Sequence, residues 1–274
     1  MLSAAFGLFV VAGVMAGLVS GLFGMGGGLA VVPMMVIALS LIDLGDAYVM
    51  HLSVGTSLVV MVLTSIYTTL LRGRAGDLDR TLLHGLLFPV AAGAAIGSAI
   101  GDALPGYVLR TLFICFVIYM IYRVFQRRRM ARQVENSTGA ALVAQVPTRM
   151  QFALYGLIGG LFGALLGIGV ALVVTPFLTS RGYRMKDASA VAASMAIVVG
   201  LAAGTGYAIG GLNEEGLPAW SFGYVYLPAA LGLVIGALAG SPLGIRLSHR
   251  LSDTTQFTLF LGYLVAVLIG MATR

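Results

Sequence analysis

The sequence predicts an all-α polytopic membrane protein, and its composition and its long apolar runs are the grounds for this. Apolar residues make up 59% of the chain and charged residues only 9%, whereas soluble domains carry about 25% charged residues. Apolar runs long enough to cross the hydrocarbon core, about 20 residues, fill nearly the whole sequence. These runs are continuous and do not alternate with polar residues, so we expect helices rather than a β-barrel.

Ten apolar segments fall into two groups of five. They cover residues 3–23, 26–42, 47–71, 82–103 and 107–125, and then 150–166, 168–180, 186–210, 222–245 and 254–273. The longest polar stretch, which is rich in arginine, separates the groups. The sequence therefore predicts a first transmembrane repeat over 1–125, a basic cytoplasmic linker over 126–149 and a second transmembrane repeat over 150–274.

The charges of the loops predict the orientation. Basic residues gather at 72–80, in the linker, at 181–186 and at 246–250, whereas acidic residues gather at 43–46, 102 and 214–215. Because lysine and arginine mark cytoplasmic loops, we expect both termini on the outer side. Arg110, close to an outer loop, departs from this pattern.

With that orientation, the first apolar region of each half must begin and end on the same side of the membrane. These regions, 3–42 and 150–180, each contain a glycine-rich turn. Each region forms either two short spans or a re-entrant hairpin. The first half then starts outside and the second half starts inside.

An internal repeat links the two halves. Glycines and apolar residues of the first hairpin, Gly13, Gly17, Gly24, Gly26, Leu29, Val31 and Pro33, recur without a gap as Gly156, Gly160, Gly167, Gly169, Leu172, Val174 and Pro176. The ladder Pro89-x3-Gly93-x3-Gly97-x3-Gly101 recurs as Pro228-x3-Gly232-x3-Gly236-x3-Gly240. We therefore predict two inverted-topology repeats, each a glycine-broken helical hairpin followed by three transmembrane helices, an architecture typical of secondary transporters.

The two glycine-rich turns are the leading candidates for a substrate site. The first holds Gly24, Gly26, Gly27 and Gly28, and the second holds Gly167 and Gly169. Glycine lets the backbone approach a ligand, and the unpaired N–H groups of a restarting helix favour an anion. The alternative is a tight turn with close helix packing.

Hydroxyls and histidines supply a second set of candidates. Thr56 and Ser57, with Ser194 at the equivalent place in the repeat, can donate hydrogen bonds to sulfonate or carboxylate oxygens; such hydroxyls also bond to their own helix. His51 near the outer vestibule and His84 on the inner side are candidate proton carriers, or simply interfacial residues.

Several chemistries are disfavoured. No aspartate or glutamate lies deep in a predicted span, which argues against a carboxylate relay and a cationic substrate. The chain lacks the ATP-binding motif Gly-x4-Gly-Lys-Ser/Thr and the motifs of intramembrane enzymes. We expect a non-enzymatic protein with no cofactor and no metal site. The net charge of +6 lies in short loops, so no nucleic-acid partner is expected.

The residues after each glycine turn carry a family resemblance. Val31-Val32-Pro33 and Val174-Thr175-Pro176 end the two hairpins, and Val54-Gly55-Thr56-Ser57-Leu58 follows the first. In these motifs the chain resembles the sulfite exporter TauE/SafE family. The resemblance implies export of sulfite, sulfoacetate or a related organosulfonate across a bacterial inner membrane. Half two has Val170-Ala171 where half one has Gly27-Gly28, so we expect the two turns to contribute unequally.

Alternatives remain at this stage. An uncoupled anion channel, or a carrier that takes up another small anion, fits the same pattern. The expected partners are a small anion and the lipid bilayer, and the sequence leaves a homodimer open.

Overall fold

The computed structural model of the chain describes residues 2–23, 28–41, 48–74, 79–134, 145–248 and 250–273, and it confirms the predicted all-α membrane fold. The helices are α1 Leu2–Phe23, α2 Gly28–Leu41, α3 Val49–Arg74, α4 Arg80–Ala103, α5 Gly106–Val134, α6 Arg149–Leu166, α7 Ala171–Ser180, α8 Met185–Gly210, α9 Leu227–Ser248 and α10 Asp253–Ala272. Within the described ranges, eight of them are long and apolar enough to cross a membrane, and α2 and α7 are shorter.

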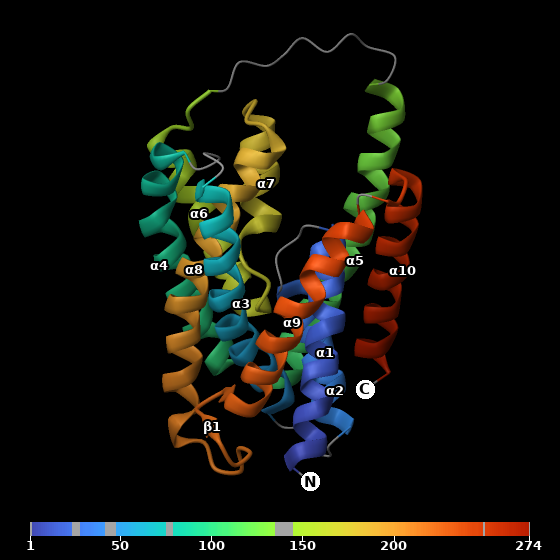
Figure 1. Cartoon of the computed structure of the whole chain (residues 1–274). Helices are drawn as coiled ribbons and strands as arrows, with labels where there is room; N and C mark the ends of the chain where they lie inside the picture. The colour runs from blue at the N-terminus through green and yellow to red at the C-terminus, as the bar shows by residue number, and fades with distance from the viewer. Residues whose placement is uncertain are drawn as a thin grey trace.

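The ends of the helices gather at two ends of the bundle (Figure 1). We call the upper end in that view, where α4 and α6 begin with Arg80 and Arg149, the basic end. The lower end, where α4 finishes beside Asp102 and α8 leads to Glu214, is the acidic end. The N-terminus lies at the acidic end (Figure 1).

Within the described residues, the second arm of each hairpin is too short to span a bilayer. Helix α2 has 14 residues and α7 has 10, which correspond to about 21 Å and about 15 Å of helix. The hydrocarbon core is about 30 Å thick. The lengths therefore favour re-entry over a full crossing, a choice that the sequence leaves open.

Two segments differ from the sequence-based boundaries. Helix α5 continues to Val134, beyond the predicted start of the linker. The apolar stretch from residue 222 begins as an antiparallel β-hairpin, β1 Ser221–Phe222 and β2 Val225–Tyr226, and only then becomes α9. Gly223 forms its turn at φ 54°. Tyr224 and Tyr226 of the hairpin are buried, and β2 packs against α3 and α8 rather than extending a membrane helix; Phe222 is exposed.

The closest helix packing joins the two halves. Helix α1 packs along α9, α6 packs along α4, and α3 and α8 pack at the centre. Glycines line the paired faces: a Cβ added at Gly13 would lie 2.8 Å from the Cα of Leu233, and one at Gly97 would lie 2.9 Å from the Cβ of Ala164. The glycine ladders thus serve close backbone packing, as expected of Gly-x3-Gly spacing.

Arg110, the charge that departs from the loop pattern, has a structural role. Its Nε donates a hydrogen bond of 2.6 Å to the carbonyl oxygen of Met271 in the last turn of α10. A cation at a helix C-terminus satisfies free carbonyls and interacts favourably with the helix dipole. Arg110 therefore joins α5 to the end of α10.

Candidate substrate site

The first residue of α2 meets the second glycine turn inside the bundle. A Cβ added at Gly28, the first residue of α2, would lie 2.6 Å from the Cα of Ile168 in the other turn. No side chain fits at that contact. Gly24, Gly26 and Gly27 lie outside the described residues, whereas Gly28, Gly167 and Gly169 are brought together.

The turn between α6 and α7 depends on glycine at two positions. Gly167 ends α6 at φ 65° and Gly169 follows at φ 75°, in the left-handed region that other residues disfavour. Helix α7 then starts after Val170, which makes no side-chain cap. The first N–H groups of α7, at Ala171 and Leu172, have no acceptor within the helix.

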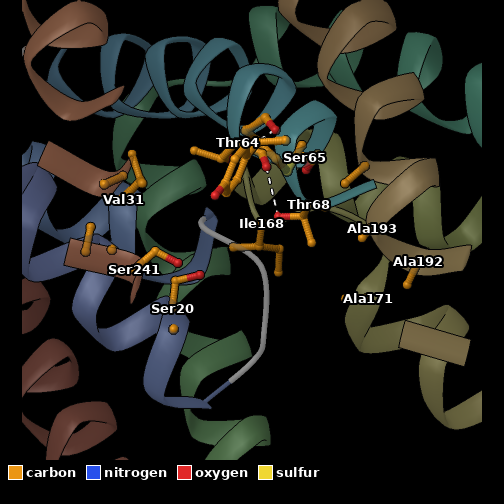
Figure 2. A pocket seen from close by; sticks show the side chains of 18 of the residues that line it. Ser20, Val31, Thr64, Ser65, Thr68, Ile168, Ala171, Ala192, Ala193 and Ser241 are labelled. Carbon is orange, nitrogen blue, oxygen red and sulfur yellow. Dashed lines mark hydrogen bonds between the residues drawn. The ribbon is translucent and has the colours of Figure 1, made fainter. Parts of the chain in front are cut away.

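A cavity of about 360 Å³ lies beside this turn (Figure 2), lined by the halves of α1, α3 and α9 that lie nearer the basic end. Its walls come from α1, α2, α3, α8, α9 and the start of α7. The polar residues of its lining are Ser20, Thr64, Ser65, Tyr67, Thr68, Ser189 and Ser241, beside Gly169 and Ala171. Among the described residues of the lining, none is charged.

The hydroxyls of the cavity fall into two groups. Thr64 donates to the carbonyl of Val60 at 3.0 Å and Thr68 donates to that of Thr64 at 2.9 Å, so both donors are occupied. Four serines of the lining have no hydrogen-bond partner within the described part of the chain: Ser20, Ser65, Ser189 and Ser241. These four are available to donate to a ligand, and Figure 2 shows Ser20 and Ser241 close together.

The predicted hydroxyl candidates lie outside this lining. Ser57 is fully buried and donates to the carbonyls of Val54 at 2.7 Å and Gly167 at 3.2 Å, so it braces the glycine turn. Thr56, also fully buried, accepts a hydrogen bond of 3.0 Å from the N–H of Tyr226. Ser194 donates to the carbonyl of Ala190 at 3.0 Å within its own helix.

A buried aromatic layer separates the cavity from the acidic end. We call Tyr207, Tyr224 and Tyr226, together with Thr56 and Ser57, the aromatic barrier. The N–H of Tyr224 donates to the carbonyl of Tyr207 at 3.2 Å. Burial, reinforced by nearby Glu214, raises the pKa of Tyr224 to about 12, so its hydroxyl stays neutral. All five residues are at least nine-tenths buried.

A second cavity, of about 540 Å³, lies on the other side of the barrier. His51, Asp102, Glu214 and Tyr48 contribute to its lining. The hydroxyl of Tyr48 donates to Glu214 at 2.6 Å, and this bond raises the pKa of Tyr48. His51 thus lies at this second cavity, at the acidic end of the bundle. His84 lies at the basic end, where its Nδ1 is 2.8 Å from the carbonyl oxygen of Arg80.

Sequence reasoning did not single out Ser20 and Ser241 as site residues. Ser20 lies on α1, and Ser241 follows Gly240 in the ladder of α9. The two residues meet only because α1 packs along α9. Their one signal in the sequence is a serine beside a packing glycine in each helix, Ser20-Gly21 and Gly240-Ser241.

Comparisons with known proteins agree with this architecture. The family model described as "Sulfite exporter TauE/SafE" matches residues 9–271. A "Probable membrane transporter protein" of Haemophilus influenzae is 27% identical over 264 residues, which cover 96% of this chain and 97% of that protein. One from Methanocaldococcus jannaschii is 28% identical over 257 residues, covering 89% and 87%. No solved structure matches the chain.

A third relative, the "Probable membrane transporter protein YunE" of Bacillus subtilis, is 25% identical over 277 residues and is covered to 96% of its length. The match to the family model extends over nearly the whole chain, and the relatives are matched over 87% to 97% of their length. This chain therefore belongs to the sulfite exporter TauE/SafE family of membrane transporters.

Proposed function

We propose that this transporter exports a small anion, sulfite or an organosulfonate such as sulfoacetate, across the bacterial inner membrane by alternating access. The observation that carries the proposal is the uncharged, hydroxyl-lined cavity at the glycine turn, separated from the acidic end by the aromatic barrier. A site that is reached from one end and sealed toward the other is what one conformation of an alternating carrier requires.

The charges support the orientation. Arg80, Arg149 and Arg181 lie at the basic end, and lysine and arginine mark the cytoplasmic side. The basic end then faces the cytoplasm and the acidic end, with both termini, faces the periplasm. In this orientation the cavity is loaded from the cytoplasm, as an exporter in its loading state should be.

The lining fits an oxyanion with a short organic tail. Oxyanions only accept hydrogen bonds, and the lining offers the N–H groups that begin α7 and four serine hydroxyls. Its volume of about 360 Å³ exceeds by about tenfold the volume of a water molecule, about 30 Å³. Ala192, Ala196 and Leu238 add an apolar wall that would suit the carbon chain of an organosulfonate.

The membrane potential suits export. An inside-negative potential contributes about 2.3 kcal/mol per elementary charge per 100 mV, which favours outward accumulation of a monoanion by about fifty-fold. A carrier without a coupled ion could therefore export such an anion. The buried barrier favours a carrier over an open channel, because a channel needs a path that is continuous at one moment.

The first test is thermal stabilisation of the purified transporter by sulfite, sulfate, taurine, isethionate, sulfoacetate and acetate, with matched cations as controls. A ligand that binds only the folded state raises the melting temperature once its concentration exceeds its Kd. We expect a shift with sulfite or organosulfonates that falls at least tenfold in apparent affinity in the double variant Ser20→Ala, Ser241→Ala.

The matched control is Ser248→Ala, also on α9: Ser248 does not line the cavity, and its hydroxyl donates to the carbonyl of Ile245. It should bind the anions as the unaltered transporter does. Stabilisation by a cation and by none of the anions would refute the anion site. Flux into proteoliposomes that rises linearly with anion concentration, without saturation, would point instead to a channel.

A further inference from the structure

His51 is the one histidine of the described chain that is buried, and its two ring nitrogens have different surroundings. Its side chain is only 4% exposed. Nε2 lies 3.0 Å from the carbonyl oxygen of Leu104, which caps the end of α4. Because a carbonyl can only accept, Nε2 carries the hydrogen. Nδ1 is then the bare acceptor, and it has no partner within the described residues.

The ring of His51 links the vestibule to the aromatic barrier. It stacks on the ring of Tyr224 with centroids 4.8 Å apart. Tyr224 sits in the turn of the β-hairpin, whose next residues bond to α3 through Thr56. One side chain therefore contacts the end of α4, the hairpin and the second cavity at once. A change in its charge acts on the elements that close the acidic end.

The groups that face His51 come from every element around it. They are Tyr48 before α3, Asp102 on α4, Tyr107 on α5, Glu214 after η2 Gly211–Asn213, and Tyr224 on the hairpin, against whose ring Tyr207 of α8 packs. The two carboxylates of this set attract an imidazolium. Its bond to Glu214 raises the pKa of Tyr48, and burial raises the pKa of Tyr224, so these two hydroxyls stay neutral where histidine titrates.

Protonation at Nδ1 conflicts with the closed arrangement. A second N–H on the ring would be buried without an acceptor within the described residues, and an unpaired buried charged donor is costly. If the hairpin withdraws, water and the carboxylates of Asp102 and Glu214 can reach that nitrogen. The protonated ring therefore favours the open acidic end, by the linkage between binding and conformation.

We propose that His51 is a proton-binding site, and that a proton bound from the acidic end opens the aromatic barrier. The proposal rests on the proposed function, in which that end faces outside and the barrier opens during transport. It gives the transporter a proton ligand at the vestibule: acid on the outer side increases the fraction of molecules whose acidic end is open.

The chain carries its own reporter for this opening. Trp220 is its single tryptophan, and its carbonyl accepts a hydrogen bond of 3.2 Å from the N–H of Leu227, across the base of the hairpin. The fluorescence of the full-length protein in detergent would be followed from pH 8 to pH 5. Hydrogen exchange of the amides of Tyr224 and Tyr226, corrected for intrinsic rates, is the second readout.

We expect an acid transition between pH 8 and pH 5, together with loss of amide protection at Tyr224 and Tyr226. The transition should vanish in His51→Gln, which keeps a donor toward Leu104, and persist in the double variant His84→Gln, His249→Gln. Asp102→Asn with Glu214→Gln should lower the midpoint by at least half a pH unit, since it removes the charges that attract the imidazolium.

An acid transition that stayed unchanged in His51→Gln would overturn the proposal. The same holds if neither readout moved with pH in the unaltered protein. Should His51→Gln fail to fold, the carboxylate variant decides, because an unmoved midpoint would equally overturn the site. These readouts need no substrate. A chain that binds no anion but shows the His51-dependent transition would therefore refute the proposed function and leave the proton site intact.

Discussion

Two helix pairs, α1 with α9 and α4 with α6, carry the same repeated glycines and pack them differently. Gly17 on α1 lies against Ala237 of α9, where an added Cβ would be 2.6 Å from the Cα. In the other pair, Gly160 on α6 corresponds to Gly17, and Ser98 on α4 corresponds to Ala237. Gly160, however, lies against Val90 and Ala94 instead of Ser98. The second pair is therefore displaced by at least four residues, about one helical turn.

The facing ladders repeat this displacement. Gly93 on α4 lies against Leu157, and Leu157 corresponds to Val14 on α1. Gly232, the counterpart of Gly93, lies against Phe9 and Val10 instead of Val14. Glycine faces bring backbone against backbone, so few side chains interlock to fix a single register. One repeated glycine pattern therefore supports two helix packings. The two halves can adopt different conformations although their sequences carry the same pattern.

Exchange of the two registers is the largest effect that this comparison predicts. In a Cys115→Ser background, spin labels at Val11 and Leu243 report on α1–α9, and labels at Leu154 and Ile100 report on α4–α6; all four sites are exposed. On reorientation, the first distance should lengthen and the second should shorten, each by about 5 Å. Double electron–electron resonance with and without saturating isethionate measures both. Changes of the same sign in both pairs would contradict the exchange.

Bulky substitution of the ladder glycines tests how tightly the two pairs are packed. Gly236→Val and Gly97→Val place a Cβ within 3 Å of α1 and of α6, respectively. Overpacking of this kind costs about 1–3 kcal/mol or more, so both variants should melt at clearly lower temperature in detergent. Gly262→Val on α10, where nothing lies within 4 Å of the added Cβ, is the control. Equal melting of all three would mean that the backbones are not in contact.

The hydroxyl of Thr56 in the aromatic barrier accepts a hydrogen bond from the protein, whereas the four serine hydroxyls of the cavity have no partner within the described residues. The variant Thr56→Val tests this difference. The change leaves the buried N–H of Tyr226 without its acceptor, at a cost of about 1–3 kcal/mol. We expect lower thermal stability and faster exchange of the Tyr226 amide. Ser53→Ala, one turn away on α3, removes a buried hydroxyl that has no partner within the described residues and should cost nothing. An unchanged Thr56→Val protein would show that Thr56 does not hold the hairpin.

The smallest effect is expected at two tyrosines, Tyr207 on α8 and Tyr67 on α3. Tyr207 is fully buried beside Gly101, with no hydrogen-bond partner for its hydroxyl in the described chain, whereas Tyr67 is 51% exposed at the open cavity. Tyr207→Phe should raise stability by up to about 1 kcal/mol, because it removes an unpaired buried group. Tyr67→Phe should leave the melting temperature unchanged. A destabilised Tyr207→Phe would mean that the hydroxyl has a partner.

The fold was accessible from the sequence where local composition decides it. Apolar runs predict the helices, and the glycines at 167 and 169 predict the broken hairpin that the structure contains. The β-hairpin was missed because Phe222, Tyr224, Val225 and Tyr226 form an apolar run like the start of a span. Contact with α3 and α8 is what distinguishes the hairpin from the start of a membrane helix. Such contact produces no periodic pattern in the sequence.

The site was less accessible, because it is assembled across the two halves. Gly169 was predicted and lines the cavity. Thr56 and Ser57 were predicted from their chemistry, but the structure gives both hydroxyls partners within the protein. A hydroxyl in a helix has the same sequence signature whether it faces a ligand or a neighbouring backbone. The packing of α1 on α9 decides which serines face the cavity, and one sequence does not encode that visibly.

The absence of charge from the described lining of the cavity has an electrical consequence. A carrier that holds its anion with ammonium or guanidinium groups returns empty with a positive charge, so voltage acts on the return step. Here the dipoles of N–H and O–H groups would hold the anion. The loaded site then carries the whole negative charge, and the empty site carries none. Voltage should accelerate the loaded outward step and leave the empty return step indifferent to membrane potential.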